Sequence, residues 1–363
     1  MWCTLRLWTV CCLVVSSLFA APLLAESKDA EYSVDSREYK LLLNPSKFHP
    51  DTPSALATLW DGHLKRLIDD ALGMKDHTHR YTGTFDVNQP KRRVIRFWDT
   101  VAPYQCTFKN HGYNLRERVE LVDGQEQADG REVTLKLRDS DPVRVANTDM
   151  NSSDGDAKSK FEEDIVPLKG RNKQVYTVMY SSSTSKKLKG DGTLSKMGDV
   201  FDLYPKLNAN LKEDGTYLGP NDAVAVVSDL SLYEEVYEGP SIDLGHVTAD
   251  LSVSLWSTRN DNRPGAPLIA ELSFKYKLGK KAKEAKKAAN RADALFSKLQ
   301  DLEWISATSD TKTNFVYDYA RFCQGRLLLH AAEYTAFEGL SANPLVAPRG
   351  EKARRERPSA DGR

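Results

Sequence analysis

Charged side chains two residues apart occur in several short segments of this sequence. Glu162 and Asp164 are separated by one residue, and so are Arg116 and Arg118. In an extended strand, such residues lie on the same face. Two carboxylates on one face can share a hard cation such as Mg²⁺ or Mn²⁺, and two basic side chains can bind several phosphate oxygens. Basic residues beside a metal held by carboxylates are typical of phosphoryl chemistry.

Five segments place such charges opposite a mostly apolar face, so each is predicted to be a strand. Any single pair is better explained by an ion-paired or solvated strand face, but the recurrence in five strands favours a shared surface. The segments are 36–41, with Ser36, Glu38 and Lys40 on one face; 115–119, with Arg116 and Arg118; 134–138, with Lys136 and Arg138; 160–165, with Lys160, Glu162 and Asp164; and 271–275, with Glu271 and Lys275.

A sheet that closes with these charged faces inward would enclose a polar tunnel and have helices on its apolar outside. A sandwich whose charged faces meet solvent fits the same pattern. The pattern alone therefore leaves both architectures open.

Helices and connections are predicted around these strands. Residues 52–72 carry leucines at helical spacing, with Thr52 as the N-cap, Pro53 at the first helical position and Gly73 at the end. Residues 280–302 form a second helix, whose basic face lacks the interleaved aromatic residues of a nucleic-acid surface. Residues 174–180 are predicted to be a strand. The polar stretches 139–159 and 181–198 are predicted to be a long exposed loop and a connection.

Composition places the chain among folded proteins without a bulk charge. It has 363 residues, enough for one large or two ordinary domains, with 51 basic and 51 acidic residues. This balance gives no bulk attraction to nucleic acid or to an acidic membrane surface. The sequence contains no Walker loop, HExxH motif, zinc-type Cys/His spacing or nucleophile elbow. The charged strand faces are therefore the main candidates for function.

Residues 1–25 are predicted to be a cleaved secretory signal peptide, which would make the protein secreted or periplasmic. Residues 7–20 are largely apolar and uncharged, and Leu-Leu-Ala at 23–25 offers a cleavage site before Glu26. A membrane anchor is the alternative. Pro22 and the small residue at the cleavage site favour processing, so we expect no membrane span in the mature protein.

Processing at this site would leave two cysteines, Cys106 and Cys323. An oxidising compartment permits a disulfide between them, but their spacing does not require one. Asn151 begins an N-glycosylation motif, which matters only in a eukaryotic host. Residues 339–363 are rich in Pro, Arg and Ala and are predicted to be a disordered tail.

Several motifs, taken in order, resemble those of the CYTH-like superfamily, also called the triphosphate tunnel metalloenzymes. The opening strand, Ser-Arg-Glu-Tyr-Lys at 36–40, is similar to the ExExK strand of that family. Phe-Trp-Asp-Thr at 97–100 resembles the family's Tyr-Phe-Asp-Thr segment, and residues 112–118 resemble its G..LR.R strand. Thr-Leu-Lys at 134–136 matches its TLK strand. Residues 160–164 resemble its R.E.E strand, and residues 269–273 resemble its AELE strand. The resemblance spans residues 34–276.

This resemblance implies an α+β fold with a closed antiparallel eight-stranded β-barrel, flanking helices and a charged tunnel, in a domain of residues 30–330. Members of the family hydrolyse triphosphates or cyclise ATP with Mg²⁺ or Mn²⁺. The resemblance implies catalytic roles for Glu38, Lys40, Glu162 and Asp164; metal binding by Glu38, Glu162, Asp164 and Glu271; and binding of a small polyanionic phosphate by Lys40, Arg116, Arg118, Lys136, Arg138 and Lys160.

Two positions depart from the family pattern. Ser36 stands where the first Glu of ExExK belongs, and Ser273 stands where a second late Glu belongs. Each serine removes one potential metal ligand from a site that relies on several.

Three functional hypotheses follow. The first is an exported metal-dependent phosphohydrolase that acts on inorganic triphosphate or an organic polyphosphate. The second is a non-catalytic tunnel that binds a polyanion through the same basic residues. The third is a secreted barrel whose charges are structural, with its function in loops or tail.

Overall fold

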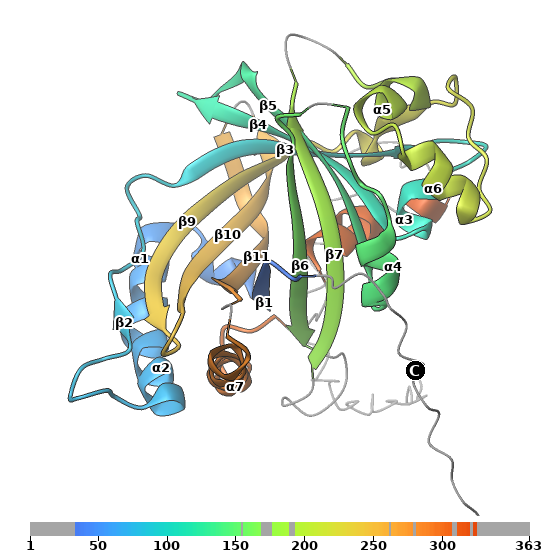
Figure 1. The fold of residues 1–363 in the computed structure, drawn as a ribbon. Coiled ribbons are helices and arrows are strands. Elements are labelled where there is room, and N and C mark those ends of the chain that lie inside the picture. Colours follow the sequence, from blue (N-terminus) through green and yellow to red (C-terminus); the bar gives the residue numbers. More distant parts are fainter. Residues whose placement is uncertain are drawn as a thin grey trace, which may run out of the picture. The chain divides into compact units, whose positions relative to one another are not determined.

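The computed structural model describes residues 33–153, 155–167, 176–188, 193–260, 263–278, 281–306, 311–319 and 322–324. All described helices and strands lie in one compact unit, Val34–Arg363 (Figure 1). The signal peptide predicted at 1–25 and the tail predicted at 339–363 lie outside the described residues. No helix among the described residues has the length and apolar character needed to cross a membrane.

The architecture is α+β, and its largest element is a mostly antiparallel sheet that closes into a ring. Nine described strands form the ring in the order β9-β10-β11-β1-β6-β7-β5-β4-β3, and β3 pairs back with β9. Two short strands extend it, β2 (Tyr81–Thr82) beside β9 and β8 (Val224–Val226) beside β3. The ring strands are β1 Ser36–Leu43, β3 Lys91–Thr100, β4 Tyr113–Val122, β5 Gln125–Asp139, β6 Lys158–Pro167, β7 Tyr176–Lys187, β9 Leu232–Asp243, β10 Thr248–Asn260 and β11 Arg263–Lys277.

The ring differs from the expected barrel in two respects. It has nine strands where eight were expected, and one neighbouring pair, β1 and β6, is parallel. In this pair Ser36 is opposite Glu162 and Glu38 is opposite Asp164. The five predicted charged segments lie in β1, β4, β5, β6 and β11, so all of them are ring strands.

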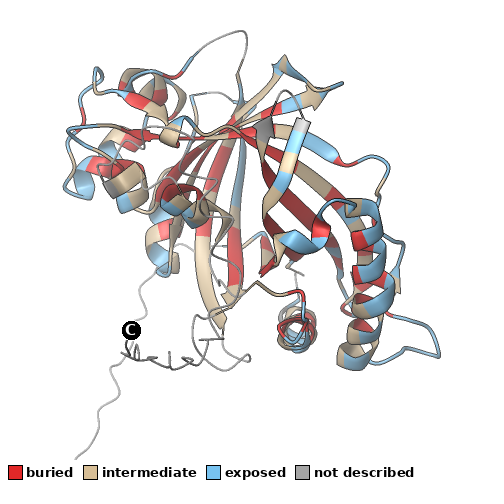
Figure 2. Cartoon of the chain, turned by 180° about the vertical axis from the view of Figure 1, so that it is seen from behind, coloured by how far each residue is buried: buried red, intermediate tan, exposed pale blue. Residues whose placement is uncertain are grey.

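One group of helices covers the outer face of β1, β10 and β11. It consists of α1 (Thr52–Leu59), a π-helical turn (Trp60–Leu64), α2 (Lys65–Leu72) and α7 (Ala282–Leu299). Outward-facing Tyr39 and Leu41 of β1 pack in one buried cluster with Leu56 of α1 and Phe296 of α7. Figure 2 shows that buried residues concentrate on the strands, while the helices have both buried and exposed faces. The helices predicted at residues 52–72 and 280–302 are therefore present in the structure.

The ends of the first helical segment follow from local chemistry. Asp51, rather than Thr52, is the N-cap, and its carboxylate accepts a hydrogen bond of 3.1 Å from the Ser54 N–H. Gly73 ends α2 with φ 67°, a conformation that favours glycine.

A second group of short helices packs against β4, β5 and β7. It consists of α3 (Thr107–Asn110), α4 (Pro142–Asn147), α5 (Met197–Leu203) and α6 (Leu207–Glu213). The prediction of a long exposed loop at 139–159 was wrong, because α4 lies within it and Val145 and Met150 are buried. The predicted connection at 181–198 was also wrong in its first part, because β7 continues to Lys187.

The last described elements are α8 (Lys312–Tyr319) and a 3₁₀ turn (Phe322–Gln324). Val316 and Tyr317 of α8 pack in a buried cluster with Leu42, Phe97 and Trp256 of the ring. Leu42 and Trp256 also line the charged cavity, so this apolar cluster adjoins the interior of the ring. The two remaining described helical turns are Pro45–Phe48 and Val227–Asp229.

Candidate functional site

A cavity of about 450 Å³ lies on the inward face of the ring strands. Its lining contains nine lysine and arginine side chains but only four carboxylates, so it has an excess of positive charge. The basic residues are Lys40, Arg116, Arg118, Lys136, Arg138, Lys158, Lys160, Lys275 and Lys312, and the acidic ones are Glu38, Glu132, Glu162 and Glu271.

The period of two along each strand explains this gathering. Inward positions on β5 are Glu132, Thr134, Lys136 and Arg138, while Val133 and Leu135 between them are buried in the cluster beneath the second group of helices. The cavity includes all six basic residues predicted to bind phosphate. It therefore brings together side chains from β1, β4, β5 and β6, as the sequence pattern predicted.

Asp164 is a buried carboxylate beside this cavity, with its side chain 1% exposed. Its Oδ1 lies 2.6 Å from Lys40 Nζ, and its Oδ2 lies 2.7 Å from Arg138 and 3.7 Å from Lys136 Nζ. Burial alone would raise the pKa of Asp164, but Lys136, Lys40 and Arg138 together hold it well below its usual range. Asp164 is therefore an ionised carboxylate at neutral pH.

Glu162 faces a second set of cations. Lys275 Nζ donates a hydrogen bond to Glu162 Oε1, and Lys136 Nζ lies 3.6 Å from Oε2. The Ser36 hydroxyl donates a 3.2 Å hydrogen bond to the same Oε1. Burial opposes ionisation, but Lys136 and Lys275 outweigh it and lower the pKa of Glu162 to about 2.

The remaining predicted metal ligands are Glu38 and Glu271. Glu38 Oε2 lies 3.1 Å from Lys40 Nζ, and this lysine is the main group that lowers the pKa of Glu38 against the opposing effect of burial. Glu271 Oε1 lies 2.9 Å from Lys312 Nζ of α8, which also donates a 2.6 Å hydrogen bond to Ser254 Oγ. Lys312 further lies 5.0 Å from the centre of the Trp256 ring.

This arrangement does not fit a divalent cation well. Each of the four predicted metal ligands lies beside a lysine, so at least one oxygen of each carboxylate already faces an ammonium group. The described residues contain no group of three or more His, Cys, Asp or Glu side chains placed to hold a metal ion. Mg²⁺ and Mn²⁺ need several oxygen ligands that converge on one point, and here the carboxylates converge on lysines instead.

Several guanidinium groups in the cavity lack partners for some of their donors. The Nε atoms of Arg116, Arg118 and Arg138 are buried and have no hydrogen-bond partner among the described residues. Burial, reinforced by the neighbouring Arg118, lowers the pKa of Arg116 to about 9, which leaves it protonated at neutral pH. Burial also lowers the pKa of Lys136 to about 8. A buried donor without an acceptor is costly, so an anion would be stabilised here.

Some cavity residues were not assigned to the site from the sequence. The period of two placed Lys275 on the charged strand face of Glu271, but no role in the site was predicted for it. Ser183 and Ser185 of β7 also line the cavity, but their segment has too few apolar residues to show a strand pattern. Lys312 has no such signal, because tertiary packing of α8 brings it to the ring.

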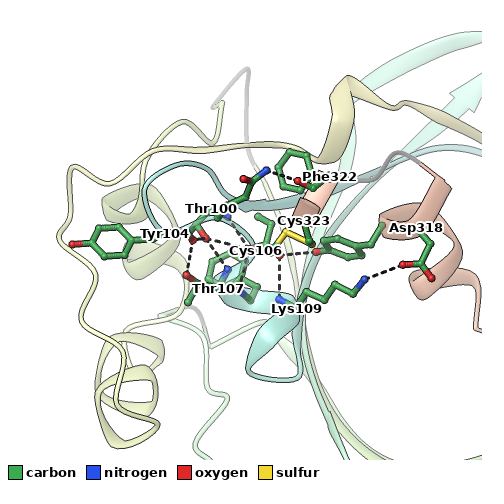
Figure 3. The surroundings of a disulfide bond; sticks show 12 residues. Thr100, Tyr104, Cys106, Thr107, Lys109, Asp318, Phe322 and Cys323 are labelled. Atoms are coloured by element: carbon green, nitrogen blue, oxygen red, sulfur yellow. Dashed lines mark hydrogen bonds and ion pairs between the residues drawn. A yellow bond between two sulfur atoms is a disulfide. The ribbon is translucent and has the colours of Figure 1, made fainter. Parts of the chain in front are cut away.

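A disulfide between Cys106 and Cys323 fastens the end of the described chain beside α3 (Figure 3). It joins residues 217 positions apart, so the bond that the sequence only permitted is present. Lys109 of α3 pairs with Asp318 of α8 at 3.4 Å, as Figure 3 also shows. Tyr317 donates a 2.9 Å hydrogen bond to Asp99, a buried carboxylate at the end of β3. These contacts hold α8, and with it Lys312, against the ring.

Comparison with known proteins adds little at the level of sequence: no family model and no curated protein matches this chain. Among solved structures, one match is a protein from Hippeastrum, described as an adenylyl cyclase candidate with a dominant triphosphatase activity. It is 12% identical, covers 79% of this chain and 96% of its own, and has a TM-score of 0.36. Another is the PH1819 protein from Pyrococcus horikoshii OT3, with 11% identity, coverage of 76% and 94%, and a TM-score of 0.29.

Proposed function

We propose that the ring cavity binds a small polyanionic phosphate compound, such as tripolyphosphate or an organic polyphosphate. The observation that carries this proposal is the excess of nine basic over four acidic side chains around a volume of about 450 Å³. That volume suits a small ligand. The motif resemblance to triphosphate tunnel proteins points to the same ligand class.

The geometry supports binding because the cations come from several strands that the sheet holds rigidly. Arg116 and Arg118 project from β4, Lys136 and Arg138 from β5, and Lys40 from β1. Buried positive charges that are not fully paired destabilise one another, and phosphate oxygens would relieve this repulsion. The unpartnered Nε–H groups can donate hydrogen bonds to such oxygens.

Metal-dependent hydrolysis of the bound triphosphate is the second candidate function. Its support is that Glu38, Glu162 and Glu271 line the same cavity as the basic residues, as phosphoryl chemistry requires. If Mg²⁺ or Mn²⁺ bound, these carboxylates with Asp164 would hold it, and the ion would neutralise phosphate charge. Because these carboxylates already form ion pairs with lysines, we rank metal-dependent hydrolysis below phosphate binding.

The proposed location is secreted or periplasmic. The apolar segment at 1–25 has the features of a cleaved signal peptide. The Cys106–Cys323 disulfide supports an oxidising compartment independently, because such bonds are rare in a reducing cytosol.

Calorimetric titration with tripolyphosphate, together with an assay for released phosphate in the presence of Mg²⁺ or Mn²⁺, tests the proposal. We expect saturable binding with one ligand per chain. Binding without phosphate release supports a binding protein, and binding with metal-dependent release supports the hydrolase. Absence of both would reject a phosphate site and leave the charges with a structural role.

A further inference from the structure

We propose that Lys275 is a built-in cation of the cavity, which takes the place of a divalent metal and makes polyanion binding independent of metal. This inference rests on the proposed function and adds to it a statement about how the ligand's charge is balanced. Its basis is that the four predicted metal ligands lie beside lysines and do not converge on a common point where a metal ion could bind.

The first step is the position of Lys275 in the sheet. Lys275 of β11 is opposite Glu38 of β1, and Ser36 of β1 is opposite Glu162 of β6. Strand β1 thus lies between Lys275 and Glu162, which are two strand spacings apart across the sheet, about 10 Å, and offset by two residues along β1. An extended lysine and an extended glutamate can span this distance together, and their hydrogen bond crosses over β1.

The second step concerns Ser36, the residue of β1 that lies under the hydrogen bond between Lys275 and Glu162. Ser36 is 4% exposed, and its hydroxyl donates to the same Glu162 oxygen that accepts from Lys275. A glutamate at position 36 would bring a second carboxylate beside Glu162 and fill the space above β1. The short serine therefore allows the ammonium group to reach Glu162, so Ser36 and Lys275 act as a matched pair.

The third step is the charge that results. The Glu162 side chain is 7% exposed, so an unpaired carboxylate would repel a phosphate ligand at close range. The Lys275 side chain is 34% exposed and lines the cavity, so its ammonium group faces Glu162 on one side and the ligand space on the other. A divalent metal would have the same two roles, screening a carboxylate and attracting phosphate oxygens.

The test compares tripolyphosphate binding by the wild-type protein in EDTA and in Mn²⁺, together with Mn²⁺ titration of the ligand-free protein by electron paramagnetic resonance. We expect full binding in EDTA and no tight Mn²⁺ site in the wild-type protein. Binding that requires Mn²⁺ would overturn this inference while leaving the proposed function intact. Absence of binding in both conditions would remove the proposed function and this inference with it.

Variants at the pair supply the second arm. Lys275→Met should weaken tripolyphosphate binding in EDTA about tenfold, because one charge-assisted contact is lost. Added Mn²⁺ should restore part of that loss, and the combination with Ser36→Glu should create a measurable Mn²⁺ site. Unchanged affinity of Lys275→Met in EDTA would contradict the proposal.

Two controls separate this effect from misfolding and from general charge loss. Lys275→Arg keeps the cation and should bind within about threefold of the wild-type protein, since it can make the same charge-assisted contact. Lys277→Met removes an exposed lysine of the same strand outside the cavity lining and should leave the affinity unchanged. If Lys275→Met does not fold, judged by near-ultraviolet circular dichroism, the wild-type comparison in EDTA and Mn²⁺ decides.

Discussion

Lys40 Nζ lies 2.6 Å from Asp164 Oδ1 across the parallel pair of strands β1 and β6. The contact joins residues 124 positions apart, and Lys40 lines the charged cavity. Because the Asp164 side chain is 1% exposed and also contacts Arg138, one buried carboxylate compensates two partly buried cations. The site therefore depends on this aspartate for stability as well as for charge.

Asp164→Asn should lower the free energy of unfolding by about 3 kcal/mol, because it leaves Lys40 and Arg138 without their shared buried anion. Urea denaturation followed by circular dichroism measures this change. Asp70→Asn, at an exposed position of α2, is the matched control and should change stability by less than about 0.5 kcal/mol. Equal stability of both variants would show that Asp164 does not stabilise the ring.

Arg116→Met should weaken tripolyphosphate binding by about tenfold or more, because it removes a buried guanidinium group whose Nε lacks a protein partner. The same change should leave stability unchanged or raise it, since Arg116 lies close to Arg118 in a buried position. Calorimetry measures the affinity. Arg66→Met removes an exposed arginine of α2, and a similar loss in that control would point to a nonspecific charge effect.

Affinity for a polyanion should fall as the pH rises through about 8, because burial lowers the pKa of Lys136 to about 8. Below this pH, Lys136 is protonated and attracts the ligand, and above it that charge is lost. Ligand binding favours the protonated form, so protons should be taken up on binding near pH 8. Titrations in buffers of different ionisation enthalpy measure this uptake. In Lys136→Met the uptake should shrink to the contributions of the ligand and of Arg116, whose pKa is lowered to about 9, so an undiminished uptake would exclude Lys136.

Loss of the disulfide in Cys106→Ser/Cys323→Ser should lower the free energy of unfolding by about 4 kcal/mol, because the bond closes a loop of more than two hundred residues. Denaturation of the wild-type protein with and without a dithiol reductant should give the same difference. Hydrogen exchange should rise in α8, which the bond fastens beside α3. Unchanged exchange there would mean that Tyr317 and Asp318 hold α8 by themselves.

The charged strand faces were predictable because the period of two is a local property. Lys40 and Glu38 share a face in any extended segment, and burial of Tyr39 and Leu41 on the other face determines which way that face points. The same reasoning assigns Arg116, Lys136 and Glu162 to one inner surface, and all three line the cavity.

Other features had no local signal. Strand β7 carries Ser181, Ser183 and Ser185 toward the interior, and because Ser182 and Thr184 on its other face are polar as well, this part of the strand lacks the apolar alternation that marks a strand. Helix α4 begins at Pro142 with Asp141 as its cap, but only its packing shows that Val145 is buried. The number of strands in the ring also depends on which strands pair along their edges to close it. The closing pair is β3 with β9, and no local sequence signal marks that pairing.

Local sequence is enough to establish which side chains share a strand face, because backbone geometry sets that relation within a few residues. This relation indicated the basic wall of the cavity. The partner of each charge depends on the folded ring: Glu162 meets Lys275 across β1, and Glu271 meets Lys312 of α8. Electrostatic pairing depends on distances between segments far apart in the chain, and those distances exist only after the ring closes.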